Sequence, residues 1–171
     1  MSELFIIDAS ENPVSFNQLN STSILITEMA IKEGFGVCFN SFDYASNLLK
    51  RGTYRRARFH MVLSDSFVHR NCCELLDLSF LDPSKDYTSN FDIFLKRFSF
   101  LENLLDILYH NGFSDCSVFI DGWGTAETIG DFSRIATTKK DLLAKLWNQI
   151  YENKDECGYC FPPTLARVNL K

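Results

Sequence analysis

The chain has 171 residues, of which 46% are hydrophobic and 23% are charged, so it can bury a substantial core and is too apolar for a disordered segment. No apolar run approaches the ~18 residues that a membrane span needs. Glu3 and Asp8 stand where a secretion signal would carry basic residues. We therefore expect one globular domain over residues 1–171, cytoplasmic and without a membrane partner.

The formal charge of −5 is unevenly distributed along the chain. Residues 50–70 carry six bases and one acid, whereas both flanking regions are acidic. The stretch "KRGTYRRAR" (50–58) could clamp RNA or dock an acidic protein. We interpret it instead as a solvated loop and strand edge, where cations discourage aggregation. A nucleic-acid partner is therefore not expected.

Short apolar runs alternate with helical patterns along the chain. We expect strands at 3–9, 36–40, 56–65, 116–122, 127–136 and 165–170. We expect helices at 24–35, 41–52, 90–112 and 137–153. This alternation predicts an α+β fold, in which helices pack on a mixed sheet of about five strands.

The expected helices differ in the strength of their patterns. Residues 90–112 repeat apolar side chains at steps of three and four, ending at Gly112, which is typical of a helix with one buried face. A weaker stripe in 24–35 ends at Gly34 and is formed by Ile24, Leu25, Met29 and Ile31. Thr138 and Asp141 have the spacing of a capping box before the helix at 137–153. The strand at 127–136 could pair with 116–122 across the turn between them.

The sequence "CGYC" places Cys157 and Cys160 at the spacing of a redox site or of half a zinc site. Pro162 and Pro163 follow at once and forbid a helix running on from the second cysteine, as a thioredoxin-type site requires. The three histidines are scattered along the chain, so a zinc site lacks further ligands. We expect unlinked thiols in a loop, no metal and no cofactor.

Three expected strands end in aspartate, at Asp8, Asp65 and Asp121. Carboxylates at the ends of sheet strands build magnesium sites in doubly wound folds, and metal-dependent nucleases of the PIN type look like this in outline. The alternative function is therefore a metal-dependent nuclease or phosphoryl-transfer enzyme. Aspartate is also favoured in turns and helix caps after strands, which needs no catalysis. No nucleophile with a partner base is evident, so we assign no catalytic residue.

Acidic and aromatic residues gather in two segments near the C-terminal end. The loop "DGWGTAETIGD" surrounds a tryptophan with carboxylates, and "YENKDE" adds further acids. Such a surface suits an anchor for a basic protein. The candidate partner-binding residues are Asp121, Trp123, Glu127, Asp131, Glu152, Asp155 and Glu156.

The segment "GTAETIGDFSRIATTKKDLLAKLWNQIY" (124–151), which passes through "GDF" into a helix, resembles bacterial immunity proteins of contact-dependent growth inhibition systems. The resemblance implies stoichiometric inhibition, in which the protein covers the active site of a cognate toxin, often a basic nuclease. Immunity proteins have unrelated folds, so no site residue carries over. The sequence therefore predicts a non-enzymatic, acidic inhibitor of a bacterial toxin.

Overall fold

The computed structural model describes residues 4–9, 16–39, 59–64, 73–121 and 133–171. Its strands are β1 (Leu4–Ala9), β2 (Gly36–Phe39), β3 (Phe59–Ser64), β4 (Asp115–Asp121), β5 (Ser133–Thr138) and β6 (Thr164–Asn169). Its helices are α1 (Phe16–Glu33), α3 (Cys73–Leu76), α4 (Tyr87–His110) and α5 (Leu142–Cys157). The predicted α+β class is confirmed. The helix expected at 41–52 and the basic band 50–58 lie outside the described residues.

The described strands form one six-stranded sheet in the order β2-β3-β1-β4-β6-β5, rather than a sheet of about five strands. Its neighbours run antiparallel, except that β5 and β6 run parallel, so the predicted mixed sheet is confirmed. The expected pairing of 116–122 with 127–136 is wrong, because β6 lies between β4 and β5. The sequence between the two strands is compatible with a hairpin, but the last strand of the chain lies between them in the sheet.

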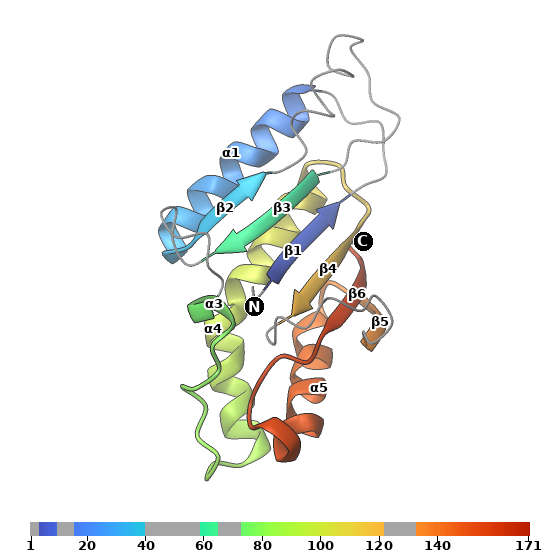
Figure 1. The fold of residues 1–171 in the computed structure, drawn as a ribbon. Coiled ribbons are helices and arrows are strands. Elements are labelled where there is room, and N and C mark those ends of the chain that lie inside the picture. Colours follow the sequence, from blue (N-terminus) through green and yellow to red (C-terminus); the bar gives the residue numbers. More distant parts are fainter. Residues whose placement is uncertain (1–3, 10–15, 40–58, 65–72, 122–132) are drawn as a thin grey trace.

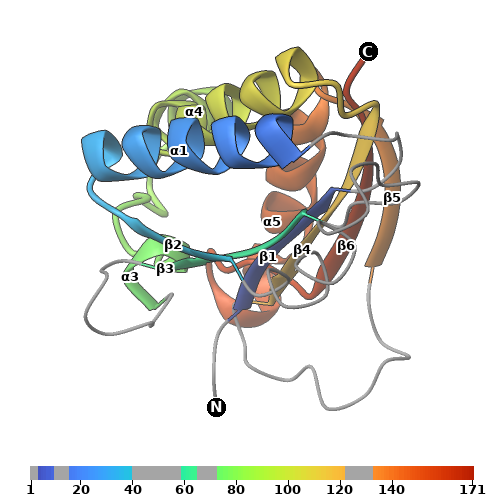
Figure 2. The same ribbon diagram turned by 90° about the horizontal axis from the view of Figure 1, so that it is seen from above.

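Helices α1, α4 and α5 all lie on one side of the curved sheet (Figures 1 and 2). The side chains of β4 show the consequence, since Cys116, Val118 and Ile120 are buried and the residues between them are half-buried. The described residues contain no helix long and apolar enough to cross a membrane. The helical layer and one face of the sheet thus enclose a common core.

The Phe-rich helix α4 is confirmed, and it begins three residues before the predicted start. The Asp86 side chain caps it by accepting a hydrogen bond from the Ser89 amide at 2.7 Å. Gly112 follows the C-cap with a φ of 93°, a conformation that favours glycine. Its buried face carries Asn90, Phe94, Phe98, Phe100, Leu101, Leu104, Leu105 and Leu108.

Helix α5 is also confirmed, but it is not capped as the sequence suggested. The Thr138 hydroxyl donates to the Asp141 carboxylate at 2.8 Å, so the predicted pair does form. Asp141 itself occupies the N-cap position, and its side chain makes no capping hydrogen bond there. Thr138 is the last residue of β5. The pair therefore closes the β5–α5 turn rather than capping the helix.

Candidate functional site

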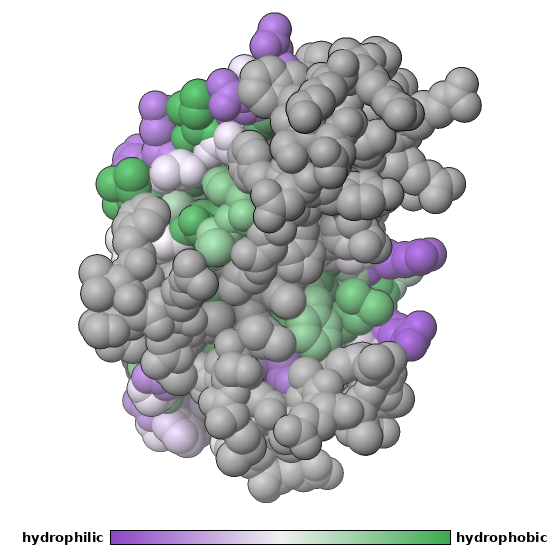
Figure 3. Space-filling view, turned by 45° about the horizontal axis from the view of Figure 1, so that its top comes forward, coloured by the Kyte–Doolittle hydropathy of each residue, from purple (hydrophilic) through white to green (hydrophobic). Residues whose placement is uncertain are grey.

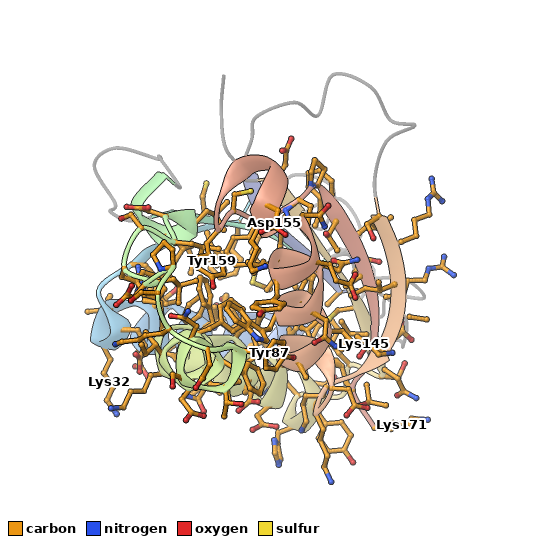
Figure 4. All side chains as sticks on the ribbon, turned by 90° about the horizontal axis from the view of Figure 1, so that it is seen from below. Lys32, Tyr87, Lys145, Asp155, Tyr159 and Lys171 are labelled. Atoms are coloured by element: carbon orange, nitrogen blue, oxygen red, sulfur yellow. The ribbon has the colours of Figure 1, made fainter. Side chains whose placement is uncertain are left out.

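Helices α4 and α5 run antiparallel and bring two chain segments to one end of the molecule. Tyr87, the first residue of α4, contacts Tyr151 near the end of α5, and Lys139, just before α5, pairs with Asp106 near the end of α4. The loop before α4 and the last turn of α5 consequently lie together at the lower end in Figure 1. Figure 4 looks onto this end, with Tyr87, Tyr159 and Asp155 close to its centre.

Half-buried tyrosines line this end around a buried tryptophan. Trp147 is 0% exposed, and its ring is stacked on those of Phe91 and Tyr159 with interplanar angles of 22°. Tyr87 meets Tyr151 edge-on, with ring centroids 4.8 Å apart. Tyr87, Tyr151 and Tyr159 are each partly exposed, so they present rigid aromatic surface to solvent.

The loop before α4 holds its carboxylates in fixed positions. Asp82 accepts hydrogen bonds from the Ser84 hydroxyl and amide at 2.7 and 2.9 Å, and these bonds lower the pKa of Asp82. The hydrogen bond from the Ser89 amide likewise lowers the pKa of Asp86. Both carboxylates therefore stay negatively charged well into the acid range, in positions that these hydrogen bonds fix.

Asn90 joins this loop to the tyrosines. It is fully buried, and its amide nitrogen donates to the Asp82 carbonyl at 2.8 Å and to the Tyr159 hydroxyl at 3.2 Å. Its amide oxygen accepts from the Asp82 backbone N–H at 3.2 Å. One buried side chain on α4 thus fixes both the acidic loop and the segment after α5.

The last turns of α5 carry acids that its own dipole disfavours. The C-terminal end of a helix has partial negative charge, yet Glu152, Asp155 and Glu156 all lie within its last six residues. The only base there is Lys154, which pairs with Asp155 at 3.2 Å and lies over the Tyr151 ring. The Asp155 side chain is 87% exposed, so its charge contributes little to the stability of the fold. We name the surface formed by Asp82, Asp86, Glu152, Asp155 and the three tyrosines the acidic end.

Neutralising the helix-terminal acids should stabilise the protein. We expect Glu152→Gln with Asp155→Asn to raise the free energy of unfolding by about 0.3 kcal/mol in total, mainly through Asp155 in the last turn of α5, because the unfavourable interaction with the helix dipole is removed. Urea denaturation followed by circular dichroism measures the change. The matched variant Glu102→Gln, on an exposed site of α4 far from a helix C-terminus, should leave the stability nearly unchanged. A lower stability of the double variant would show that these acids support the fold.

The Asp86 cap predicts a pH dependence. Its pKa is lowered from 3.8 on folding, so its contribution to stability is present above pH 3.8 and is lost as the pH falls through the lower folded value. Asp86→Ala should therefore be less stable than the wild type at neutral pH, and the difference should shrink below pH 3.8. Thermal denaturation of both proteins from pH 7 down to acid measures this. An equal difference at every pH would contradict the role of the charge.

The structure places the predicted partner-binding residues in different surroundings. Glu152 and Asp155 are exposed at the acidic end, and Glu156 lies on the same helix. Asp121 is fully buried at the end of β4, so it does not belong to an exposed surface. Trp123, Glu127 and Asp131 lie outside the described residues.

Sequence reasoning missed the contribution of the loop before α4. Asp82, Asp86 and Tyr87 lie about 65 residues before the predicted acids, and only the antiparallel packing of α4 on α5 brings them together. The alternating aspartates and serines of "DPSKDYTS" mark a loop with side-chain caps, which is the one local signal. That signal does not reveal that the loop lies beside the end of α5.

The convergence of strand-end aspartates that the alternative nuclease function requires is not found for the two strands that the structure describes. Leu4 pairs with Asp121 and Asp8 pairs with Ser117, because β1 and β4 run antiparallel. Asp8 and Asp121 therefore lie at opposite ends of the strand pair, about 13 Å apart along it. Asp65 lies outside the described residues. Among the residues that the structure describes, no group of three metal-ligating side chains comes together.

The two cysteines of "CGYC" lie at the wrong end of a helix for thiol chemistry. Cys157 is the last residue of α5, and Gly158 follows with a φ of 74°. Redox motifs use the positive N-terminal end of a helix to stabilise a thiolate, which the C-terminal end does not do. Cys160 is a half-buried free thiol after the helix, as expected from the sequence.

Comparisons with known proteins give no relative: the sequence matches no family model, and neither a curated protein nor a solved structure matches it.

Proposed function

We propose that this protein is an immunity-type inhibitor, which neutralises a cognate bacterial toxin, most simply a basic nuclease, by binding it one to one over its active site. The observation that carries the proposal is the acidic end. There the chain retains acids against the dipole of α5 and places them beside partly exposed tyrosines. A local arrangement of charges that lowers stability, here offset only in part by the Lys154–Asp155 pair, is typical of a functional surface.

The chemistry of the acidic end suits a basic protein. Exposed carboxylates speed the encounter with a positively charged partner, and they do so most strongly at low salt. Binding would bury the remaining exposed surface of the tyrosines and so slow dissociation, since interface hot spots are enriched in Tyr, Trp and Arg. The ordered carboxylates of Asp82 and Asp86 need little rearrangement before they contact a partner.

The resemblance of residues 124–151 to immunity proteins supports the choice of partner class. The described part of that segment forms β5, a turn and most of α5, and its last residue, Tyr151, belongs to the acidic end. The alternative function, a metal-dependent nuclease, has less support, because Asp8 and Asp121 lie at opposite ends of the β1–β4 strand pair. Inhibition by binding needs no such convergence.

The direct test is protection of a growing cell. The toxin domain that the proposal expects to be encoded beside this gene is expressed from an inducible promoter, with and without this chain. We expect growth to stop without the chain and to continue with it, and the two purified proteins to elute as a one-to-one complex. Failure to protect, together with magnesium-dependent cleavage of RNA by this chain alone, would overturn the proposal.

A further inference from the structure

Helix α1 buries two polar side chains beside Leu19, Ile26 and Ala30, while several other apolar side chains face outward. Thr22 is fully buried and Ser23 is nearly so, and both hydroxyls donate to carbonyls of the preceding turn, at 2.6 and 2.8 Å. These bonds satisfy the hydroxyls within the helix, so burial costs little. The opposite, outward face of the helix then carries apolar residues of the kind usually found in a core.

The outward face of α1 carries an apolar stripe. Ile24, Leu25 and Ile31, three residues of the weak stripe seen in the sequence, are 49%, 42% and 59% exposed. Ile24 and Ile31 are seven residues apart, which places them on one line along the helix. Figure 3 shows hydrophobic residues reaching the surface at the upper left, where α1 lies in Figure 1. We call Ile24, Leu25, Glu28, Ile31 and Lys32 the α1 stripe.

The charges of the α1 stripe differ from those of the rest of the molecule. The chain carries −5, but the stripe carries one acid and one base, Glu28 and Lys32, and is neutral. Among the described residues neither of them forms an ion pair, and the Lys32 side chain points away from the body in Figure 4. A surface without net charge lessens the repulsion between two acidic molecules, and the stripe is such a surface.

We propose that the α1 stripe binds the same stripe of a second copy of this chain, as an antiparallel pair of helices about a two-fold axis. Such an axis makes each contact occur twice, so the surface must complement itself. When the helices cross at residue 30, midway between the two charges, Glu28 of each copy lies opposite Lys32 of the other, which satisfies both charges. Ile31 then packs next to the crossing point.

A dimer of this kind is weak. One helix face buries far less than the roughly 800 Å² per partner of a standard stable interface. We therefore expect a monomer at micromolar concentration and a growing fraction of dimer as the concentration approaches about 1 mM. The acidic end is formed by other elements, so dimerisation leaves it accessible and is independent of the proposed inhibition.

Exchanging the two charges tests the pairing specifically. In Glu28→Lys both charges of the stripe are positive, and in Lys32→Glu both are negative. Sedimentation equilibrium of each variant alone should show the dimer dissociation constant raised about tenfold or more, since like charges then face each other. An equimolar mixture of the two variants should regain the wild-type sedimentation, because the opposite charges meet again. Circular dichroism confirms that each variant is folded.

The controls separate this contact from any other self-association. Asn103→Lys adds a charge at an exposed site of α4 and should leave the dissociation constant unchanged, whereas Ile31→Asn should abolish the dimer. A wild-type protein that stays monomeric at about 1 mM overturns the proposal. So does a dimer that neither charge variant weakens, or a mixture that sediments like the separate variants.

Discussion

Replacing Trp147 by alanine should lower the free energy of unfolding by about 3–5 kcal/mol, because truncating a buried aromatic ring leaves a cavity that its neighbours cannot close. The ring is fully buried and lies within about 6 Å of five other aromatic rings, those of Tyr87, Phe91, Phe94, Tyr151 and Tyr159. Since small domains have roughly 5–15 kcal/mol in total, this is the largest single loss that we expect. Urea denaturation followed by circular dichroism measures it.

Trp147→Phe provides the matched control. It keeps an aromatic ring in the site and removes the indole N–H, which is buried without a hydrogen-bond partner among the described residues. We therefore expect the phenylalanine variant to lose clearly less stability than the alanine variant. A loss below about 1 kcal/mol for Trp147→Ala, as for an ordinary surface change, would show that the ring cluster does not hold α5 on α4.

Replacing Asn90 by leucine should lower the free energy of unfolding by about 1–3 kcal/mol. The change keeps the volume of the side chain but leaves the Asp82 backbone groups and the Tyr159 hydroxyl without their buried partner. The loop before α4 should open as well, so amide exchange at Asp82 should become faster. Both effects are measured by denaturation and by hydrogen exchange.

Asn103→Leu is the control for Asn90→Leu, because Asn103 is an exposed residue of the same helix. It should change the stability by less than about 0.5 kcal/mol. Equal stability of the two variants, with unchanged exchange at Asp82, would mean that the loop is held by other contacts. The acidic end would then not depend on Asn90.

The spacing of apolar residues in the sequence predicted those elements that bury one apolar face. Helix α4 has one apolar face against the sheet, and its sequence repeats at helical spacing, so the prediction differs from the structure only at its ends. In α1 the stripe visible in the sequence is not the buried face. Thr22 and Ser23 bond to their own helix and pack inward beside Leu19, Ile26 and Ala30, while Ile24, Leu25 and Ile31 lie outside. Periodicity identifies a helix but does not always identify its buried face.

The candidate site depended on topology, which a single sequence does not contain. Aspartates that follow strands converge only when the strands run parallel, and β1 and β4 run antiparallel. Conversely, Asp82 and Asp86 are far in sequence from Glu152 and Asp155, and only the packing of Tyr87 on Tyr151 brings the two pairs to one end. The acidic character of residues 151–156 was visible in the sequence, whereas the other half of the surface was not.

Binding of a basic toxin by the acidic end can be measured by isothermal titration calorimetry with the purified toxin domain. The double variant Glu152→Lys with Asp155→Lys is compared with Glu102→Lys. Glu102 is exposed on α4, about two turns before His110, at the end of the helix away from Tyr87. We predict one-to-one binding that the double variant weakens a hundredfold or more, as expected for losing charge pairs worth about 1.5 kcal/mol or more each, while Glu102→Lys binds like the wild type. Equal affinity of all three proteins would contradict the claim.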